Sequence, residues 1–407
     1  MTASKVTIVV PTRERPDTLR SCLRTALNQD YPNLEVIVSD NFSGPATAEV
    51  VRSMNDPRIT YLNTGRRLSM SHNWEFAIAG INEGWIVLLG DDDGLLPNCL
   101  GRVVRLVEAA GLEALSSETC RYNWPSRNVS EQAILSVPMK RGEEVVDARR
   151  ALKRLMDWEH DSLVLPHLYT GGLISAALVK RIRNINGAFF QSQIPDVYSG
   201  VAITSSINRY LFTREPFAIS GGSKYSNGAA LFALQKTEFL DEGNIPFHPD
   251  MALPETGTLT FSMPAMVCES YLQSQYLRRD HYRASAAAHL ELILNQTTTA
   301  RDLLNEWSKR FAARHGIDHA RALAASRHTP SPRRLSLLRD KIANVTSRYR
   351  VDSSYGLPLN DVFEASLAAA TILTTRPSRS KSVTRTIRRV VRRNRKATLA
   401  IGEATSG

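Results

Sequence analysis

The chain has 407 residues, of which 43% are apolar and 22% are charged. This length and composition are those of a globular protein with room for two or three domains, and they exclude a fibrous or wholly disordered chain. No apolar run approaches the roughly 20 residues that span a bilayer. The four cysteines show no CxxC spacing, which disfavours a zinc ribbon or a disulfide framework. The start of the chain lacks the layout of a signal peptide, so we expect a cytoplasmic protein.

The net charge of +11 comes from one short segment. Ten Lys and Arg residues and no acidic ones lie between Arg376 and Lys396, and outside this segment the two signs nearly balance. A body without a broad basic face argues against a nucleic-acid enzyme. In residues 383–396 (VTRTIRRVVRRNRK) the apolar side chains fall on one face of a predicted helix, which would suit an anionic membrane surface. Nucleic-acid affinity or a plain solvated tail are the alternatives.

Strand and helix patterns alternate over the first hundred residues. Continuous apolar, mostly β-branched runs predict strands at 6–10, 34–38, 59–61 and 85–89. Amphipathic spacing predicts the helices between and after them, at 18–27, 46–54, 73–79 and 98–110. This order predicts βαβ units and an α/β fold, a mostly parallel Rossmann-like sheet with helices on both faces.

Beyond residue 110 the pattern is less regular. Helices are predicted at 144–158 and 197–210, the second with Asp196 as its N-cap. After about Pro254 longer helical patterns follow, at 265–277, 284–294 and 302–314. The last thirty residues are rich in Ser, Thr and Arg, which is typical of a partly disordered tail.

Ligands of an open parallel sheet bind beyond the carboxyl ends of its strands. Asp91, Asp92 and Asp93 directly follow the fourth predicted strand. Adjacent buried carboxylates repel one another, and a hard divalent cation, Mg²⁺ or Mn²⁺, would remove that cost and hold a diphosphate as its remaining ligand. A solvated acidic turn is the alternative interpretation.

Residues 5 to about 100 resemble the nucleotide-binding half of a family 2 glycosyltransferase with the GT-A fold. The resemblance is carried by residues 6–43 (VTIVVPTRERPDTLRSCLRTALNQDYPNLEVIVSDNFS), 63–78 (NTGRRLSMSHNWEFAI) and 85–97 (WIVLLGDDDGLLP). Within them stand the family's elements in order: Pro11–Thr12, Gln29–Pro32, Asp40, the Asn63, Gly65 and Asn73 element, and Gly90–Asp93. These five ordered elements over ninety residues make the match specific.

The resemblance implies a nucleoside-diphosphate sugar as donor and Mn²⁺ or Mg²⁺ as cofactor. The donor contacts that it implies are Pro11, Thr12, Arg13, Glu14, Asp40, Asn41, Arg66, Arg67, Asn73, Asp91 and Asp92, and the metal ligands come from Asp91, Asp92 and Asp93. Turn chemistry for residues 11–16 and a solvated loop at Arg66–Arg67 are the alternatives. Many members read Asp-x-Asp-Asp where this chain reads Gly90–Asp93, so which two aspartates bind ribose and metal stays open.

An inverting transfer also needs a general base on the acceptor side. In the family this is usually the Asp of a Glu-Asp pair that opens a helix after a Gly-rich strand. In the matching stretch, 170–210, Asp196 stands in the Asp place and Pro195 in the Glu place, so the resemblance implies Asp196 as the base. A plain helix cap is the alternative, and Asp161 and Glu159 are reserve candidates.

A Gly- and Ser-rich segment follows at the place where the family often contributes a His or an Arg. Ser223, Lys224 and Ser226 are its candidates for diphosphate or acceptor contacts, against the alternative of a flexible loop.

We therefore expect a metal-dependent inverting glycosyltransferase. The resemblance suggests bacterial surface polysaccharide or glycolipid synthesis, with a saccharide or lipid-linked acceptor at the inner face of the cell membrane. The expected domains are a GT-A domain at 1–250 (nucleotide-binding half 1–110, acceptor half 111–250), a helical region at 251–330 that binds the acceptor, a partner or a second copy of the chain, and a linker and basic tail at 331–407. Two other functions stay open, a nucleotidyltransferase on a similar fold and a nucleotide-sugar-binding protein without turnover.

Overall fold

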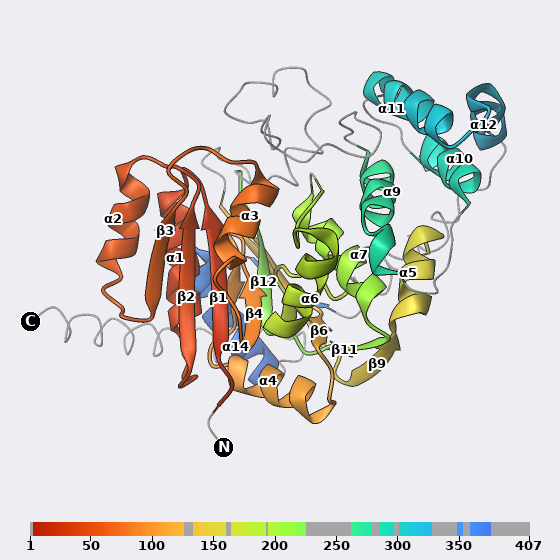
Figure 1. Ribbon diagram of the computed structural model, residues 1–407. Coiled ribbons are helices and arrows are strands. Elements are labelled where there is room, and N and C mark those ends of the chain that lie inside the picture. The colour runs from red at the N-terminus through yellow and green to blue at the C-terminus, as the bar shows by residue number, and fades with distance from the viewer. Residues whose placement is uncertain are drawn as a thin grey trace, which may run out of the picture.

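The computed structural model describes residues 3–125, 133–159, 164–192, 194–224, 262–278, 285–296, 301–327, 348–352 and 359–375. At its centre lies an eight-stranded sheet (Figure 1). Its strands, in spatial order, are β3 (Ile59–Asn63), β2 (Leu34–Asp40), β1 (Val6–Thr12), β4 (Trp85–Leu88), β10 (Gly172–Ser175), β6 (Ala114–Ser117), β11 (Arg209–Thr213) and β9 (Glu143–Asp147).

The first four strands of the chain form the parallel part of this sheet. β1 pairs in parallel with both β2 and β4, and β2 pairs in parallel with β3. All seven residues of β1 are buried, because helices cover both faces of the sheet. β10 joins in antiparallel orientation between β4 and β6, and β11 runs parallel to β6. The predicted fold class, a mostly parallel α/β sheet of the GT-A type, is confirmed.

Helices lie on both faces, as the alternation of buried side chains along the strands requires. Ile8 and Val10 belong to one core, together with side chains of α1 (Pro16–Leu27), α2 (Pro45–Ser53) and α4 (Leu100–Ala109). Val9 and Ile37 belong to the other core, which is formed with α3 (Met70–Ile78), α5 (Ala148–Met156), α6 (Ala176–Asn186) and α7 (Pro195–Ser206).

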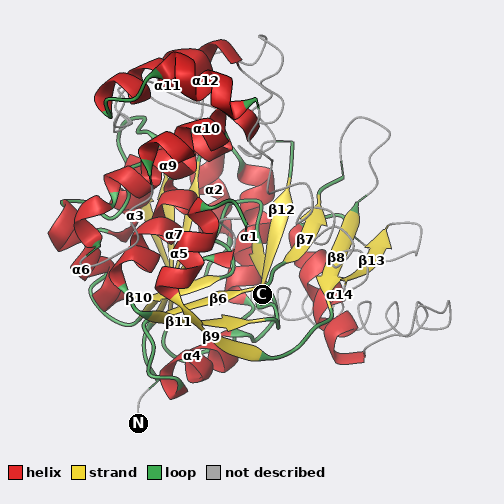
Figure 2. Cartoon of the chain, turned by 90° about the vertical axis from the view of Figure 1, so that its right-hand side faces the viewer, coloured by secondary structure: helices red, strands yellow, loops and turns green. Residues whose placement is uncertain are grey.

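A second, five-stranded sheet was not expected from the sequence (Figure 2). Its strands, in spatial order, are β13 (Arg348–Asp352), β8 (Ile134–Pro138), β7 (Cys120–Asn123), β12 (Ala218–Gly222) and β5 (Gly94–Leu95). β12 pairs in parallel with β7 and antiparallel with β5. Because β5 directly follows the acidic loop after β4, this second sheet connects that loop to the later part of the chain.

The expected tail at 331–407 is wrong over part of its length. β13 adds to the second sheet, and α14 (Val362–Thr375) packs against α1 and joins the same core as β1. The physical reason is the apolar face of α14, where Val362, Ala365, Ala368 and Ile372 are fully buried. Residues 376–407, including the predicted basic helix, lie outside the described residues.

Two predicted helices extend into strands. The prediction at 144–158 contains β9, whose edge pairs with β11, before Asp147 caps α5 by accepting a hydrogen bond from the Arg150 amide at 2.7 Å. The prediction at 197–210 is wrong at its end, since α7 stops at Ser206 and the segment RYLFT forms β11. Tertiary pairing overrides helical spacing in both segments.

The C-terminal helices are α9 (Met263–Gln273), a short 3-10 turn at Gln275–Leu277, α10 (Ala286–Gln296), α11 (Arg301–Arg314) and α12 (His319–Ser326). α9 packs on α7 and shares its core, and its other side joins a separate small core with α10, α11 and α12. The expected boundaries at 250 and 330 fall outside the described residues. Within the described part of the chain, no helix is both long and apolar enough to cross a membrane.

Candidate active site

The loops after β1, β2 and β4 meet at one edge of the central sheet. The parallel register sets Thr12 beside Asp40, and the Asn41 amide donates a hydrogen bond to the Thr12 carbonyl at 2.9 Å. The Leu89 amide donates to the Val9 carbonyl, also at 2.9 Å, so the acidic loop starts beside the end of β1. The predicted donor residues therefore come together at the carboxyl edge, as the topology requires.

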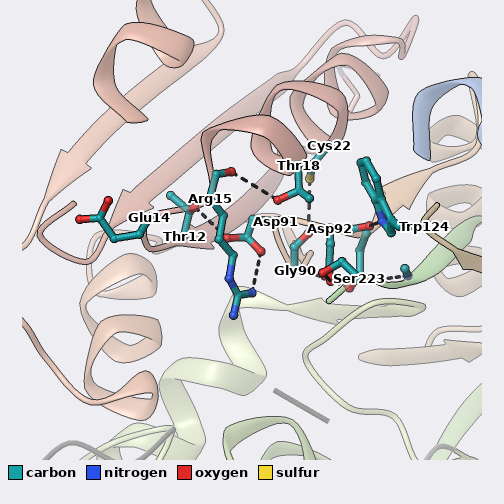
Figure 3. Close-up of polar contacts among 12 residues, drawn as sticks. Thr12, Glu14, Arg15, Thr18, Cys22, Gly90, Asp91, Asp92, Trp124 and Ser223 are labelled. Atoms are coloured by element: carbon teal, nitrogen blue, oxygen red, sulfur yellow. Dashed lines mark hydrogen bonds and ion pairs between the residues drawn. The ribbon is translucent and has the colours of Figure 1, made fainter. Parts of the chain in front are cut away.

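Asp91 is held by the loop after β1 (Figure 3). Its carboxylate accepts a hydrogen bond from the Thr12 hydroxyl at 2.8 Å and forms an ion pair with Arg15, Nη1 to Oδ1, at 3.0 Å. Burial raises the pKa of Asp91, and the positive charge of Arg15 offsets part of that rise. Arg15 was not among the residues expected in the site, although it stands in the same polar loop as Arg13 and Glu14.

Asp93 connects three segments of the chain. Its carboxylate accepts hydrogen bonds from the Gly90 amide at 3.0 Å, from the Gly221 amide at 2.6 Å and from the Thr170 hydroxyl. Burial raises the pKa of Asp93 to about 7, and the negative charge of Asp92 adds to the rise. These contacts give Asp93 a structural role at the junction of the two halves of the domain.

Asp92 lies between these two and reaches the second sheet. Its carboxylate accepts a hydrogen bond from the Ser223 hydroxyl at 2.6 Å, and its main-chain carbonyl accepts one from the Trp124 indole at 2.9 Å (Figure 3). A Cβ at Gly221 would lie 1.9 Å from that carbonyl, so only glycine fits there. Ser223 thus lies against the acidic loop, while Lys224 follows it as an exposed side chain. Ser226 lies outside the described residues.

Asp40 is fully buried, and its carboxylate is hydrogen-bonded to other residues of the protein. Its carboxylate accepts hydrogen bonds from the Tyr61 hydroxyl at 2.5 Å, the Ser43 amide at 2.9 Å and Asn63 Nδ2 at 3.2 Å. These contacts fix the end of β2 and tie it to the end of β3. A direct contact of Asp40 with the nucleoside stays a prediction.

Asn41 and Asn73 also have structural partners. The Asn41 side chain bridges the main chain of Leu68, accepting from its amide at 2.8 Å and donating to its carbonyl at 2.9 Å. Asn73, on α3, accepts a hydrogen bond from the Ser39 hydroxyl at 2.8 Å. The two asparagines hold the loop between β3 and α3 against the end of β2.

Arginines from two loops lie near each other at this edge. Burial lowers the pKa of Arg13, and the positive charge of Arg67 lowers it further. The Arg13 Nε atom is buried without a hydrogen-bond partner among the described residues. Arg66, next to Arg67, is exposed. Neighbouring guanidinium groups of this kind fit a phosphate, which can accept two parallel hydrogen bonds from each of them.

Two left-handed residues shape the loops after β1 and β2. Glu14 has φ 54° and Phe42 has φ 59°, a conformation that costs a residue with a side chain of order 1 kcal/mol or more. The loops are joined to each other, because the Glu14 amide donates to the Ser43 hydroxyl at 2.9 Å and the Glu14 carboxylate accepts from the Gly44 amide at 2.8 Å. Pro11, the last residue but one of β1, is buried.

Asp196 lies in the first turn of α7. The helix starts at Pro195 and its N-cap is Ile194, so the expectation that Asp196 is the N-cap is wrong; Asp196 is half-buried inside the helix, where the macrodipole favours a carboxylate. Burial raises the pKa of Tyr169 well above its usual range, and the charges of Asp93, Asp92 and Asp196 add to this. Asp196 thus acts on the same side chain as the acidic loop.

The reserve candidates for the base are less central. Glu159 is exposed and forms an ion pair with Arg154, Nε to Oε2, at 3.2 Å. Asp161 lies outside the described residues.

A divalent cation at this site would need substrate phosphates as ligands in addition to the protein carboxylates. Among the residues that the structure describes, no three Asp, Glu, His or Cys side chains gather as a metal-binding group. The three aspartates therefore do not form a complete ligand set by themselves. Mg²⁺ typically uses one or two protein carboxylates and completes its shell with water and substrate phosphates. Asp92 suits this role, since its Oδ1 faces the space beside Gly90, 3.3 Å from where a Cβ would stand.

Sequence reasoning missed the aromatic residues at the junction of the two halves. Trp74 and Tyr169 stack with ring centroids 5.3 Å apart, and Phe190 meets Trp74 edge-on at 5.4 Å. Tyr169 lies two residues before the Gly171–Gly172 pair. This pair is the sequence signal nearest to Tyr169, and it indicates a close approach of the main chain. A tyrosine in a loop is otherwise indistinguishable from an ordinary core residue.

Comparisons with known proteins agree with this site. Residues 7–156 match the family model described as Glycosyl transferase family 2. The chain is 31% identical over 108 residues to the succinoglycan biosynthesis protein ExoO of Rhizobium meliloti (strain 1021), which covers 26% of this chain and 31% of that protein. It is 32% identical over 104 residues to the GalNAc(5)-diNAcBac-PP-undecaprenol beta-1,3-glucosyltransferase of Campylobacter jejuni, which covers 25% of this chain and 34% of that protein.

These matches are confined to about a quarter of this chain, and the chain spans about a third of the length of the curated relatives it matches. Among solved structures, S. aureus TarS 1-349 in complex with UDP-GlcNAc aligns with a TM-score of 0.40 and 13% identity, over 76% of this chain and 73% of that one. The family match covers β1, the acidic loop and the residues that meet between them. Residues 7–156 thus form a domain of glycosyl transferase family 2.

Proposed function

We propose that the chain is a metal-dependent, inverting glycosyltransferase, which moves a sugar from a nucleoside-diphosphate sugar to an acceptor hydroxyl. The observation that carries the proposal is the segment Leu168–Thr170, which bonds both the acidic loop and the first turn of α7. The Thr170 hydroxyl donates to the Asp93 carboxylate, and the Leu168 amide donates to the Ser199 hydroxyl at 3.0 Å, which donates in turn to the Asp196 carbonyl at 2.8 Å. A transfer reaction needs the bound donor and the base that activates the acceptor to lie next to each other.

In this proposal the donor lies along the carboxyl edge of the sheet. The half-buried Arg13 and its neighbour Arg67 bind the diphosphate, since two close cations gain from an anion between them and the Arg13 Nε atom is buried without a partner among the described residues. The loops at Pro11–Glu14 and Asp40–Asn41 border the nucleoside. Hydrogen bonds within and between the two loops hold them together.

Asp92 is the carboxylate that we propose for the cation, with Asp91 held by Arg15 and Asp93 by main-chain amides. A Mg²⁺ or Mn²⁺ ion bound there would stabilise the negative charge that develops on the leaving diphosphate. Ser223, hydrogen-bonded to Asp92, orients this carboxylate. Lys224, the next residue, brings a positive charge to the same loop.

Asp196 is the proposed general base. As the acceptor oxygen attacks C1 of the sugar, the acceptor proton passes to the Asp196 carboxylate and the bond from C1 to the diphosphate oxygen breaks. Attack from the side opposite the leaving group inverts the configuration at C1. The position in the first turn of α7 favours the ionised form that a base requires.

The acceptor and the cellular role follow from the relatives by analogy. One is named for succinoglycan biosynthesis and another as a glucosyltransferase on an undecaprenol-linked glycan. We propose a saccharide or lipid-linked acceptor in bacterial surface polysaccharide synthesis, reached at the inner membrane face with the basic residues of 376–396 as a peripheral anchor.

The test begins with a thermal-shift panel of UDP, GDP and their common sugar conjugates, with and without Mn²⁺. We expect stabilisation that depends on both nucleotide and metal, that Asp92→Asn abolishes, and that is followed by release of nucleoside diphosphate when an acceptor is present. Binding with no turnover on any acceptor would favour the binding-protein alternative. Release of pyrophosphate from a nucleoside triphosphate would favour a nucleotidyltransferase.

A further inference from the structure

The transferred sugar has to lie between the group that holds the diphosphate and the base that activates the acceptor. In the function proposed above these groups are Asp92 and Asp196. Tyr169 lies beside both. The place of a Cβ at Gly90 is 2.7 Å from the Tyr169 hydroxyl oxygen and 3.3 Å from Asp92 Oδ1, and the amide of the preceding Leu168 donates to the Ser199 hydroxyl, which donates to the Asp196 carbonyl at 2.8 Å.

The hydroxyl of Tyr169 is fixed at this place from two directions. The hydroxyl donates a hydrogen bond to the Asp93 carboxylate. The ring of Tyr169 stacks on Trp74 with an interplanar angle of 16°. Trp74 is itself buried and is held edge-on by Phe190. Tyr169 as a whole residue is half-buried, in contrast to the buried residues that flank it in the core.

Gly90 leaves the space into which this hydroxyl projects. A Cβ at position 90 would lie 2.7 Å from the Tyr169 hydroxyl oxygen and 2.9 Å from Asp93 Oδ2. The main chain of Gly90 is not in the left-handed region, so its backbone conformation does not demand glycine. The glycine is needed for room, and the tyrosine hydroxyl occupies the room that a side chain at position 90 would fill.

We propose that Tyr169 contacts the transferred sugar and determines which sugar the donor site accepts; the inference rests on the function proposed above. A tyrosine hydroxyl has one proton to donate and lone pairs to accept with. With its proton directed to Asp93, the Tyr169 oxygen accepts a hydrogen bond from a hydroxyl of the sugar. A site that pairs with a substrate hydroxyl in this way discriminates strongly against donors that lack it.

The test compares a nucleoside diphosphate with its sugar conjugates by calorimetry in the presence of Mn²⁺, using UDP with UDP-glucose and UDP-N-acetylglucosamine, and GDP with GDP-mannose. In Tyr169→Phe we expect unchanged affinity for the diphosphate and an affinity for the preferred sugar conjugate about tenfold weaker. Tyr31→Phe is the matched control, because its hydroxyl bonds the Ser4 carbonyl at 2.7 Å at the opposite end of the strands, and it should change neither value.

The outcomes distinguish a failure of this inference from a failure of the proposed function on which it rests. If the wild-type protein binds no nucleotide of the panel, the proposed function fails and this inference falls with it. If the wild type binds and Tyr169→Phe weakens diphosphate and conjugates equally, or changes neither, the role of Tyr169 is overturned while the proposed function stands.

A second measurement tests the shared space directly. Gly90→Ala should lower the unfolding temperature, and the double variant Gly90→Ala/Tyr169→Phe should regain part of that loss because the clash with the hydroxyl is gone. Equal losses in both backgrounds would mean that the hydroxyl does not occupy this space, and would overturn the argument from Gly90.

Discussion

Arg15 and Asp91 form an ion pair at 3.0 Å that joins the loop after β1 to the loop after β4. Asp91 is 3% exposed and Arg15 is mostly buried, so the pair is largely removed from water. Although burial lowers it, the charge of Asp91 raises the pKa of Arg15 above its usual value. The pair therefore neutralises one of the three carboxylates of the acidic loop inside the protein itself.

Replacing Arg15 by methionine should destabilise the fold. The Asp91 carboxylate would lose its cation while it remains buried, which we expect to cost about 2 kcal/mol, less than for a fully buried pair because Arg15 is partly exposed. Urea unfolding at pH 8 measures the loss. The double variant Arg15→Met/Asp91→Asn should recover part of it, and a single variant as stable as the wild type would contradict this account of the pair.

Asp196→Asn should keep nucleotide binding and lose transfer. General bases contribute about 10²- to 10⁴-fold to a rate, and the amide cannot accept the proton. Turnover and the nucleotide Kd are measured on the same preparation. Asp147→Asn is the control, since Asp147 also opens a helix but lies at α5 on an exposed edge strand. Normal turnover in Asp196→Asn would remove this residue from the base role.

His289 should make the protein sensitive to mild acid. Burial lowers the pKa of His289, which packs at the edge of Tyr271 on α9. The unfolded chain then takes up a proton near its ordinary pKa of about 6.5, before the folded protein does. The contribution of His289 to stability is therefore constant above about pH 6.5 and falls as the pH drops below it.

The unfolding temperature measured between pH 8 and pH 5 checks this direction. In His289→Gln the slope below about pH 6.5 should be smaller than in the wild type. An identical pH profile in both proteins would show that another group causes the acid sensitivity.

The donor half, residues 1–110, could be predicted from the sequence almost element by element. Apolar runs such as Val6–Val10 are long and uninterrupted, and a strand buried on both faces needs little more than that. The acidic loop was equally readable, because its three aspartates directly follow a buried strand, where the ligands of a parallel sheet bind. The later part was not readable, since β9 and β11 are short and depend on each other for pairing.

The partners of the site residues were also beyond sequence reasoning. Asp40 is surrounded by Tyr61 and Asn63, two residues on a neighbouring strand, and Asp93 by Thr170 and Gly221 from distant segments. Such contacts depend on which strands become neighbours, which a local pattern does not determine. The second sheet is the clearest case, as it combines residues from four separate parts of the chain.

Asp361→Ala should weaken the attachment of α14. The carboxylate of Asp361 accepts from the Glu364 amide at 2.8 Å as a helix cap, and also from the Ser21 hydroxyl of α1 at 3.0 Å. Losing these two hydrogen bonds and the ion pair with Arg24 at 3.4 Å should cost about 1–2 kcal/mol in urea unfolding. Asp318→Ala removes the comparable cap of α12 without a contact to α1. A larger loss in Asp318→Ala than in Asp361→Ala would contradict the role of the link to α1.

Deleting residues 376–407 should abolish binding to anionic vesicles and leave the unfolding temperature unchanged. The deletion starts just after α14, so the described core remains intact. Each basic residue near such a surface contributes about 1 kcal/mol, and ten are removed. Co-sedimentation with phosphatidylserine vesicles at two salt concentrations is the measurement. Undiminished binding of the shortened protein would defeat the proposed anchor.

The packing of α14 on α1 has a consequence for how the protein folds while it is being synthesised. Phe363 lies under the guanidinium of Arg24 at 3.9 Å, and the apolar face of α14 completes the core on which β1 and α1 rest. A chain emerging from the ribosome normally folds its first segment first. Here the core of β1 and α1 is complete only when residue 375 has been synthesised, so the apolar side chains that α14 covers stay exposed on the nascent chain until then.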